Sequence, residues 1–309
     1  MSSRTYCTLS FRTEPTGGDV SPDHWLNDIE AFKHQSHLIL MVHGYNSDVP
    51  GTNKSMDNFE QRMDAACMAG RDWRDGAQCV RVYWPGDVDW GLLSVLGYPL
   101  TIKPAEESGN LFSEALRTLT AGNPDLRVSL IVHSLGNHFT LQALSGLNGA
   151  HGLGPRISHM VMMAAAVPTT RLAKQGDGMN RGLDQALVST ETSSLHTPHD
   201  WVLAFAFPPG ETAAGGEGFF PTALGHQHWD EAPSALNQQF AQPTQSRKYV
   251  DHTHYWTGIS ENQMFDLLGV PVTVARRTTV MNQSERATLV KDDPPSRVTQ
   301  MRETLALYE

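Results

Sequence analysis

The chain has 309 residues, of which 39% are hydrophobic and 18% are charged. This composition supplies a sizeable core and excludes a largely disordered chain. Lys and Arg number 23 against 33 Asp and Glu, so the formal net charge is −10, and no run of basic residues is present. A nucleic-acid binder needs clustered positive charge to contact phosphates, and this class of partner is therefore excluded.

The termini and the cysteines indicate where such a chain would reside. The first residues, MSSRTYCTLSFRTEP, lack the apolar stretch of a secretory signal, and no window approaches the ~20 apolar residues of a membrane span. Cys7, Cys67 and Cys79 are too few and too scattered for a disulfide framework or a zinc ribbon. We expect a soluble, cytoplasmic globular protein, whose oligomeric state the sequence leaves open.

Strand and helix patterns alternate from residue 35 to about residue 165. Four short apolar runs predict strands, the first of them buried on both faces: residues 37–42, 79–84, 128–132 and 159–167. Three helices are predicted between these strands, two of them from apolar residues three and four positions apart: residues 54–70, 106–120 and 136–147. Strands that alternate with helices pair in parallel through right-handed crossovers, so the order predicts an α/β fold with a mostly parallel sheet.

The expected domain spans residues 36–272. Residues 1–35 are interpreted as an N-terminal extension, and residues 273–309 as a polar C-terminal tail. Two long segments without clear periodicity, 87–103 and 208–243, are as compatible with lids over a binding site as with ordinary surface loops.

Ser134 lies in the strongest local motif. Residues 128–138 read Val-Ser-Leu-Ile-Val-His-Ser-Leu-Gly-Asn-His, so the serine falls between a buried strand and a helix. This is the setting of a nucleophile elbow, a tight turn that lifts the serine hydroxyl over the sheet edge. The helix N-terminus supplies N–H groups, that of Leu135 in particular, to a negatively charged oxygen. The pattern departs from the usual G-x-S-x-G at one position, where Val132 replaces the first glycine.

The segment His43-Gly44-Tyr45-Asn46 follows the first predicted strand. In a nucleophile-elbow enzyme the loop at this place supplies the second N–H that binds the oxyanion. Gly44 permits a close backbone approach, and we expect the N–H of Tyr45 to point at the substrate oxygen. His43 itself is interpreted as a buried structural histidine.

A serine hydroxyl becomes a nucleophile when a histidine removes its proton and a carboxylate orients that histidine. Asp200 follows a predicted strand near residue 193 and is the candidate acid, although a helix N-cap fits the same position. His252 is the candidate base, and His254 is the next choice. Further alternatives share only a position later in the chain than Ser134: Asp177, Asp184 and Asp230 for the acid, His226 and His228 for the base.

The 14 histidines raise zinc as an alternative. The pairs His226-x-His228 and His252-x-His254 have aspartate neighbours, and such clusters can bind this metal. However, the chain has no HExxH motif, no cysteine pair and no histidine pair four residues apart on a predicted helix. The pattern therefore favours a site without metal or cofactor.

At this point the chain resembles the α/β-hydrolase superfamily. It is most similar to a group of largely uncharacterised bacterial serine hydrolases that share three motifs: HGYN at 43–46, Trp-Pro at 84–85 and HSLGN at 133–137. The similarity covers about residues 36–147, and it thins to Asp200, residues 223–225 and a His252-x-x-Tyr-Trp pattern. That last pattern resembles the catalytic-histidine setting of several lipases and esterases and favours His252. The resemblance implies an α/β-hydrolase fold and hydrolysis of carboxylic esters.

The predicted activity is cleavage of a small-molecule ester by Ser134, His252 and Asp200 through an acyl-enzyme. Trp84 and Tyr98 are candidates to line an apolar acyl site, although a core role fits them equally well. An acyltransferase or an amidase would use the same residues, and a non-catalytic binding protein could retain the same fold. The identity of the acyl and alcohol groups cannot be read from the sequence.

Overall fold

The computed structural model describes residues 7–13, 19–32, 34–45, 49–67, 73–74, 76–86, 94–147, 156–172, 190–213, 220–230, 236, 238–241 and 251–270. The predicted tail, residues 273–309, lies outside these residues, as do parts of both segments predicted as lids. The division into extension, domain and tail therefore stays a prediction.

A seven-stranded sheet forms the centre of the described structure, with the strand order β1-β3-β2-β4-β5-β6-β7. Every neighbouring pair of strands is parallel. The strands are β1 (Thr8–Ser10), β2 (His37–Val42), β3 (Gln78–Tyr83), β4 (Arg127–His133), β5 (Arg156–Met163), β6 (Glu191–His196) and β7 (Gln238–Ala241). This arrangement confirms the predicted α/β fold.

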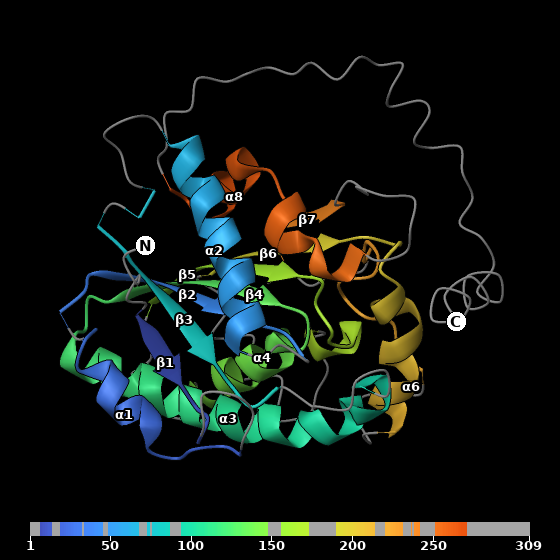
Figure 1. Cartoon of the computed structure of the whole chain (residues 1–309), viewed down its shortest axis with the longest axis horizontal. Coiled ribbons are helices and arrows are strands. Elements are labelled where there is room, and N and C mark those ends of the chain that lie inside the picture. The colour runs from blue at the N-terminus through green and yellow to red at the C-terminus, as the bar shows by residue number, and fades with distance from the viewer. Residues whose placement is uncertain are drawn as a thin grey trace. The chain divides into compact units, whose positions relative to one another are not determined.

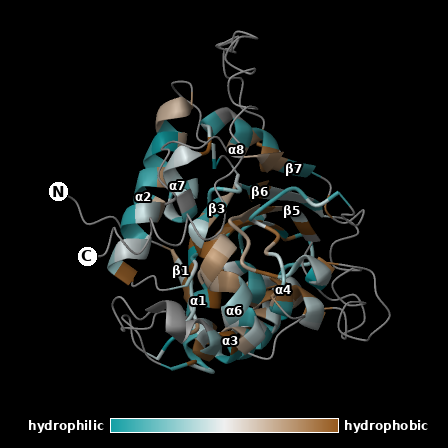
Figure 2. Ribbon diagram, turned by 90° about the vertical axis from the view of Figure 1, so that its right-hand side faces the viewer, coloured by the Kyte–Doolittle hydropathy of each residue, from teal (hydrophilic) through white to brown (hydrophobic). Residues whose placement is uncertain are grey.

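Helices cover both faces of the sheet (Figure 1). Helices α1, α3, α4 and α6 lie on one side and α2, α7 and α8 on the other, and the view of Figure 2 shows the same layers. Their bounds are α1 (His24–Ile29), α2 (Val49–Ala66), α3 (Ser94–Gly122), α4 (Gly136–Leu147), α6 (Phe207–Ala213), α7 (Tyr255–Gly258) and α8 (Glu261–Leu267). Among the described helices, none is both long enough and apolar enough to cross a membrane.

The strand order reverses beside β2. The chain passes from β2 to β3 on one side of it and then returns to place β4 on the other side. Connections that leave neighbouring strands in opposite directions open a crevice at the carboxyl ends of those strands, where α/β sheets bind ligands. Here, those ends carry Gly44 after β2 and Ser134 after β4.

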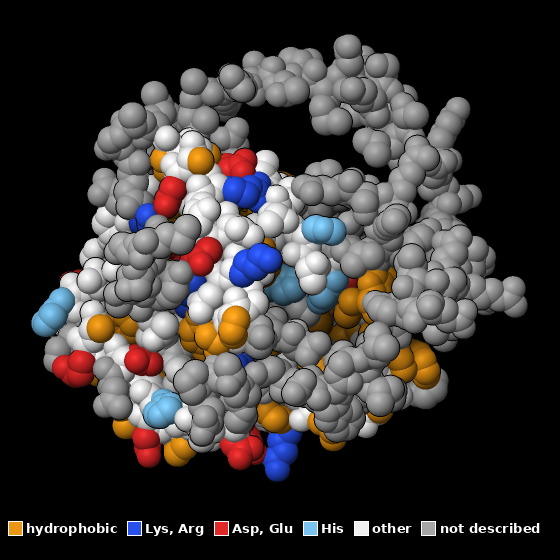
Figure 3. All heavy atoms as spheres, in the orientation of Figure 1, with side chains coloured by type: hydrophobic (Ala, Val, Ile, Leu, Met, Phe, Trp, Pro, Cys, Tyr) orange, Lys and Arg blue, Asp and Glu red, His pale blue; other side chains and the backbone are white. Residues whose placement is uncertain are grey.

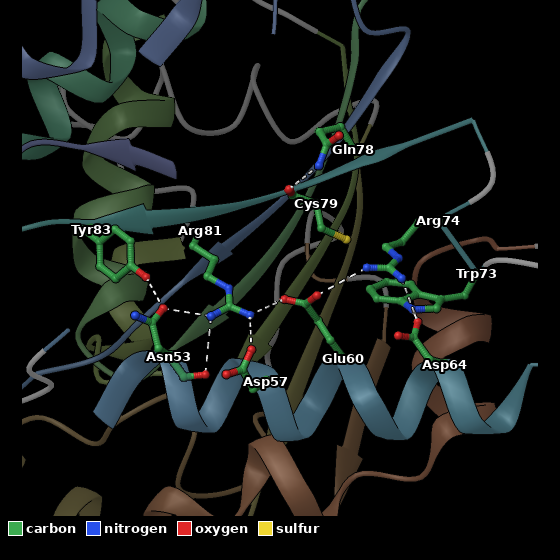
Figure 4. A network of polar contacts seen from close by, with 10 residues as sticks. All are labelled: Asn53, Asp57, Glu60, Asp64, Trp73, Arg74, Gln78, Cys79, Arg81 and Tyr83. Carbon is green, nitrogen blue, oxygen red and sulfur yellow. Dashed lines mark hydrogen bonds and ion pairs between the residues drawn. The ribbon is translucent and has the colours of Figure 1, made fainter. Parts of the chain in front are cut away.

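A network of charged side chains fastens α2 to β3 (Figure 4). The Arg81 guanidinium, with 2% of its side chain exposed, lies 2.7 Å from carboxylate oxygens of both Asp57 and Glu60. It also donates to the side-chain oxygen of Asn53 at 2.8 Å, and the Tyr83 hydroxyl donates to that same oxygen. The network fixes the first half of α2 against β3.

Two elements have bounds that differ from the sequence prediction. Helix α3 begins at Ser94 instead of 106 and contains Pro99 and Pro104, which each remove a helical hydrogen bond. Burial of Thr101, Ile102 and Ala105 against the neighbouring elements outweighs that loss. Strand β5 ends at Met163 instead of 167, because Ala164 has a positive φ of 45° and turns the chain.

The segment predicted as a lid or loop over residues 208–243 holds regular structure. Most of α6 lies in it, and β7 forms the sheet edge by pairing with β6. Likewise, β1 from the predicted N-terminal extension pairs with β3 at the opposite edge. Edge strands of three or four residues carry too short a pattern to be recognised from alternation.

Candidate active site

Ser134 occupies the turn between β4 and α4 with a positive φ of 52°. Non-glycine residues rarely adopt this conformation, and it persists only where surrounding contacts determine it. The Ser134 N–H donates to the Met163 carbonyl at 2.9 Å, and its carbonyl accepts from the backbone and side chain of Asn137 at 3.0 and 2.9 Å. The expected strand–turn–helix setting of the serine is therefore present.

Crowding at this turn falls on Gly136 and not on Val132. A Cβ atom at Gly136 would lie 2.3 Å from the carbonyl oxygen of His43. Val132 is a regular strand residue, paired with Val42 of β2 and Met162 of β5. The missing first glycine of the motif thus leaves the turn intact.

His252 lies between the serine and an aspartate. Its Nε2 is 2.7 Å from the Ser134 Oγ, and its Nδ1 is 2.7 Å from an Asp200 carboxylate oxygen. An ionised carboxylate only accepts hydrogen bonds, so Nδ1 carries the proton and Nε2 accepts from the serine hydroxyl. The three side chains come from the end of β4, the turn after β6 and the 3₁₀ helix η4 (Asp251–Thr253), and they converge as the sequence analysis predicts.

Asp200 serves two local purposes. One carboxylate oxygen faces His252, and the other accepts from the N–H of Leu203 at 3.1 Å, at the start of the π-helix η3 (Val202–Ala206). The cap-like role and the contact with His252 are therefore compatible. Asp200 is fully buried, so its carboxylate is shielded from water and the charge-assisted bond to the imidazole gains strength.

Ser134 is more enclosed than the sequence predicts. Only 4% of the residue is exposed, and 12% of the His252 side chain. The Gly44 backbone stands against the serine, since a Cβ atom at Gly44 would lie 2.7 Å from the Ser134 Cβ. In Figure 3, histidine side chains reach the surface between α2 and α6, beside a group of hydrophobic side chains.

His43 fixes the direction of the loop after β2. Its Nε2 accepts from the Arg12 guanidinium at 3.1 Å and from the Trp84 N–H at 3.3 Å, so its Nδ1 carries the proton and donates to the Gly44 carbonyl at 2.7 Å. Burial, and secondarily the Arg12 charge, hold the pKa of His43 well below its ordinary value. Because a peptide unit is planar, holding the Gly44 carbonyl also sets the direction of the Tyr45 N–H.

The two candidate substrate contacts fare differently. Trp84 is fully buried, stacked between His43 and Phe139 at ring distances of 5.6 and 5.8 Å, and its indole N–H donates to the His43 carbonyl. It packs under the loop instead of facing a substrate, because an indole that stacks on both faces is most stable in the core. Tyr98 belongs to α3, and its side chain lies outside the described residues.

The alternatives to Asp200 and His252 are found in several different settings. Asp177 and Asp184 fall outside the described residues, and His228 pairs with Asp230 at 3.6 Å. His254 precedes α7, and His226 lies in a turn, where its N–H donates to the Ala223 carbonyl at 3.1 Å. Within the described ranges, no group of three or more His, Cys, Asp or Glu side chains is arranged to hold a metal ion.

Two residues at the site were not predicted from the sequence. Arg12, 1% exposed, reaches His43 from beyond the end of β1 and also donates to the Trp84 carbonyl at 2.7 Å. His133, placed immediately before the serine, lies 2.7 Å from the backbone carbonyl of His252. The position of His133 in the HSLGN motif was a signal, whereas a single arginine in a polar N-terminal segment gives none.

Several solved structures are similar to this chain at low sequence identity and low TM-score. A gene product of Listeria innocua (lin2722) is 11% identical with a TM-score of 0.42, over 76% of this chain and 94% of that one. The catalytic core domain of acetyl xylan esterase from Trichoderma reesei is 10% identical with a TM-score of 0.39, over 76% and 97%. A lipase-esterase related protein from Clostridium acetobutylicum ATCC 824 is 9% identical with a TM-score of 0.37, over 76% and 96%.

The sequence itself matches one family model. No curated protein matches the chain. The model of an alpha/beta hydrolase family of unknown function, DUF900, matches residues 19–193, which is more than half of the chain and includes the loop after β2 and the serine turn. Together with the all-parallel sheet, this match identifies the chain as a member of the alpha/beta hydrolase family DUF900.

Proposed function

We propose that this hydrolase cleaves small-molecule carboxylic esters by way of Ser134, His252 and Asp200, without a cofactor. The observation that carries the proposal is the pair of 2.7 Å contacts on the two nitrogens of one imidazole ring. A histidine held between a carboxylate and a serine hydroxyl is the arrangement that activates a serine nucleophile.

The first half of the reaction forms an acyl-enzyme. The Ser134 Oγ attacks the ester carbonyl carbon while His252 Nε2 takes the hydroxyl proton, and the carbonyl electron pair moves to oxygen. The tetrahedral intermediate collapses, the bond to the alcohol oxygen breaks, and Nε2 returns the proton to the departing alcohol. Asp200 holds the ring in the required tautomer and stabilises the imidazolium that forms.

The second half regenerates the serine. Water attacks the acyl carbon and gives its proton to His252 Nε2, and the carboxylic acid departs as Ser134 recovers that proton. The backbone N–H groups of Leu135 and Tyr45 are the proposed donors to the oxyanion in both halves. The position of Leu135 ahead of α4 and the close approach of the Gly44 backbone to Ser134 support this assignment.

A second serine–histidine pair provides a comparison inside the same chain. His37 Nε2 lies 2.9 Å from the Ser129 Oγ, at the opposite end of β2 and β4. Burial, followed by the nearby Arg127, lowers the pKa of His37 to about 4, and Ser129 lies within a strand instead of at a helix N-terminus. A short serine–histidine contact alone therefore does not indicate a nucleophile, and Ser129 is the matched control for Ser134.

A fluorophosphonate probe and p-nitrophenyl acetate test the proposal. We expect the native protein to be labelled covalently and to release p-nitrophenol, Ser134→Ala to lose both activities, and Ser129→Ala to retain both. Absence of labelling, or equal labelling of Ser134→Ala, would refute the proposal and favour a non-catalytic member of the family. Adding methanol or glycine amide as competing acyl acceptors distinguishes hydrolysis from acyl transfer, and an anilide substrate tests amidase activity.

A further inference from the structure

We propose that His133 is a positioning residue, whose ring N–H holds the backbone of His252 in place while the His252 side chain exchanges protons with Ser134. The inference deepens the proposed function and rests on it. It assigns a role to the histidine that immediately precedes the nucleophile but that the reaction does not itself use.

The contact between His133 and the His252 carbonyl shows which atom donates the hydrogen bond. His133 Nε2 lies 2.7 Å from the carbonyl oxygen of His252, and a carbonyl only accepts, so Nε2 carries the proton and donates. The His133 ring packs beside the His252 ring with 5.1 Å between the ring centroids, and beside Tyr255 and Trp256 of α7 at 6.2 and 6.0 Å. His133 therefore connects the end of β4 to the segment that carries the proposed base.

His133 stays neutral over any ordinary working range of pH. Burial chiefly, and the neighbouring His252 next, lower the pKa of His133 to about 3. The titratable groups that act on this ring are His252, Asp200 and His43, which approach from three different segments. A neutral donor keeps its hydrogen bond at neutral pH and adds no positive charge beside His252 when that ring becomes imidazolium.

The hydrogen bond from His133 to the His252 carbonyl matters because the bond between His252 and Ser134 is temporary. The bond between His252 Nε2 and the Ser134 Oγ is lost once the serine carries an acyl group, whereas the bond from His133 to the His252 carbonyl involves no reacting atom. Further along the chain, Arg62 of α2 donates to the carbonyls of Trp256 and Ile259 at 3.3 and 2.7 Å. The segment is thus held by α2 beyond His252 and by His133 at His252 itself.

Two substitutions at His133 separate a positioning role from a role in packing. The amide nitrogen of glutamine reaches the position of Nε2, while that of asparagine reaches only the position of Nδ1. We expect His133→Gln to keep kcat for p-nitrophenyl acetate within about threefold, and His133→Asn to lose about 10- to 100-fold in kcat with little change in KM, because a displaced base costs rate more than ground-state binding. His37→Asn is the matched control, a half-buried strand histidine outside the site, and should retain full activity.

Proton NMR gives a readout that packing alone would not move. The Nδ1–H of His252, shared with Asp200, should produce a downfield resonance in the native protein and in His133→Gln. In His133→Asn the resonance should broaden or disappear. Wild-type kcat and resonance in His133→Asn, or equal losses in both variants, would overturn the inference.

The test remains decisive if His133→Asn fails to fold. In that case His133→Gln alone must retain both the kcat and the resonance, and loss of either would contradict the proposed donor. Failure of the proposed function is seen separately, because it would leave Ser134→Ala as active as the native protein. If the native enzyme is active and substitutions at His133 change neither kcat nor the resonance, only the positioning role is overturned.

Discussion

The substitution Gly44→Ala tests whether the loop after β2 must lie against the nucleophile. An added Cβ would stand 2.7 Å from the Ser134 Cβ and 2.8 Å from the His133 Nδ1. Ordinary contacts begin at 3.4 Å, so the loop or the serine must move by about 0.7 Å. Neither neighbouring atom is the end of a flexible side chain, and the displacement falls on the proposed oxyanion donor and the nucleophile.

The magnitude of the effect follows from that displacement. Overpacking a tight site costs about 1–3 kcal/mol of unfolding free energy. A misplacement approaching 1 Å at reacting groups lowers the rate by up to about 10²-fold. We therefore expect kcat/KM for p-nitrophenyl acetate to fall by about 10- to 100-fold in Gly44→Ala. The unfolding free energy, measured by urea unfolding, should fall by about 1–3 kcal/mol.

Gly122→Ala is the matched control. Nothing lies within 4 Å of a Cβ at Gly122, and the residue ends α3 without a positive φ. Its activity and stability should match those of the native protein. Native activity in a folded Gly44→Ala variant would refute the reasoning, because it would mean that the loop does not participate at its observed distance from Ser134.

Three further predictions concern charge. Asp200→Asn should lower kcat by about 10⁴-fold while the fold persists, since an amide can favour the wrong imidazole tautomer, and steady-state kinetics with thermal unfolding checks both parts. Arg81→Met should lower the unfolding free energy by about 3–5 kcal/mol in urea titrations, because it leaves the buried Glu60 carboxylate without this partner (Figure 4). The third prediction uses His133, whose pKa is lowered to about 3 in the folded protein. Below pH 6.5 the unfolded chain binds a proton at this residue that the folded chain does not, so the unfolding free energy should fall on acidification by about 1.4 kcal/mol per pH unit. His133→Gln should reduce the measured slope of unfolding free energy against pH by that amount.

Residues at strand ends could be predicted because parallel sheets bring those ends together. The pattern of residues 37–42 and 128–132 was sufficient to place Gly44 and Ser134 at the carboxyl edges of two neighbouring strands. Chain order after the nucleophile then restricted the acid and the base to later segments. Within those segments, the choice of His252 over His254 depended on the resemblance of the His252-x-x-Tyr-Trp pattern to the catalytic-histidine setting of several lipases and esterases.

Long-range packing could not be predicted in the same way. Arg12 contacts His43 across 31 positions of sequence, and nothing in the local pattern around Arg12 distinguishes it from a solvated arginine. The low exposure of Ser134 depends on how closely the Gly44 backbone approaches, which is a matter of tertiary packing. The proline-containing start of α3 is a similar case, because burial there overrides local helix propensity.

The three histidines around the serine differ in their ability to carry a positive charge. His43 is buried beside Arg12, and His133 is buried against a backbone carbonyl, so both remain neutral, while His252 alone has a carboxylate partner. A proton on His133, with its ring centroid 5.1 Å from that of His252, would repel the His252 imidazolium of the proposed transition state by about 3 kcal/mol at an effective dielectric constant of about 20. That repulsion corresponds to a roughly 10²-fold loss of rate. Of these three rings, burial of the two flanking ones therefore leaves His252 as the one on which the proposed reaction can place positive charge.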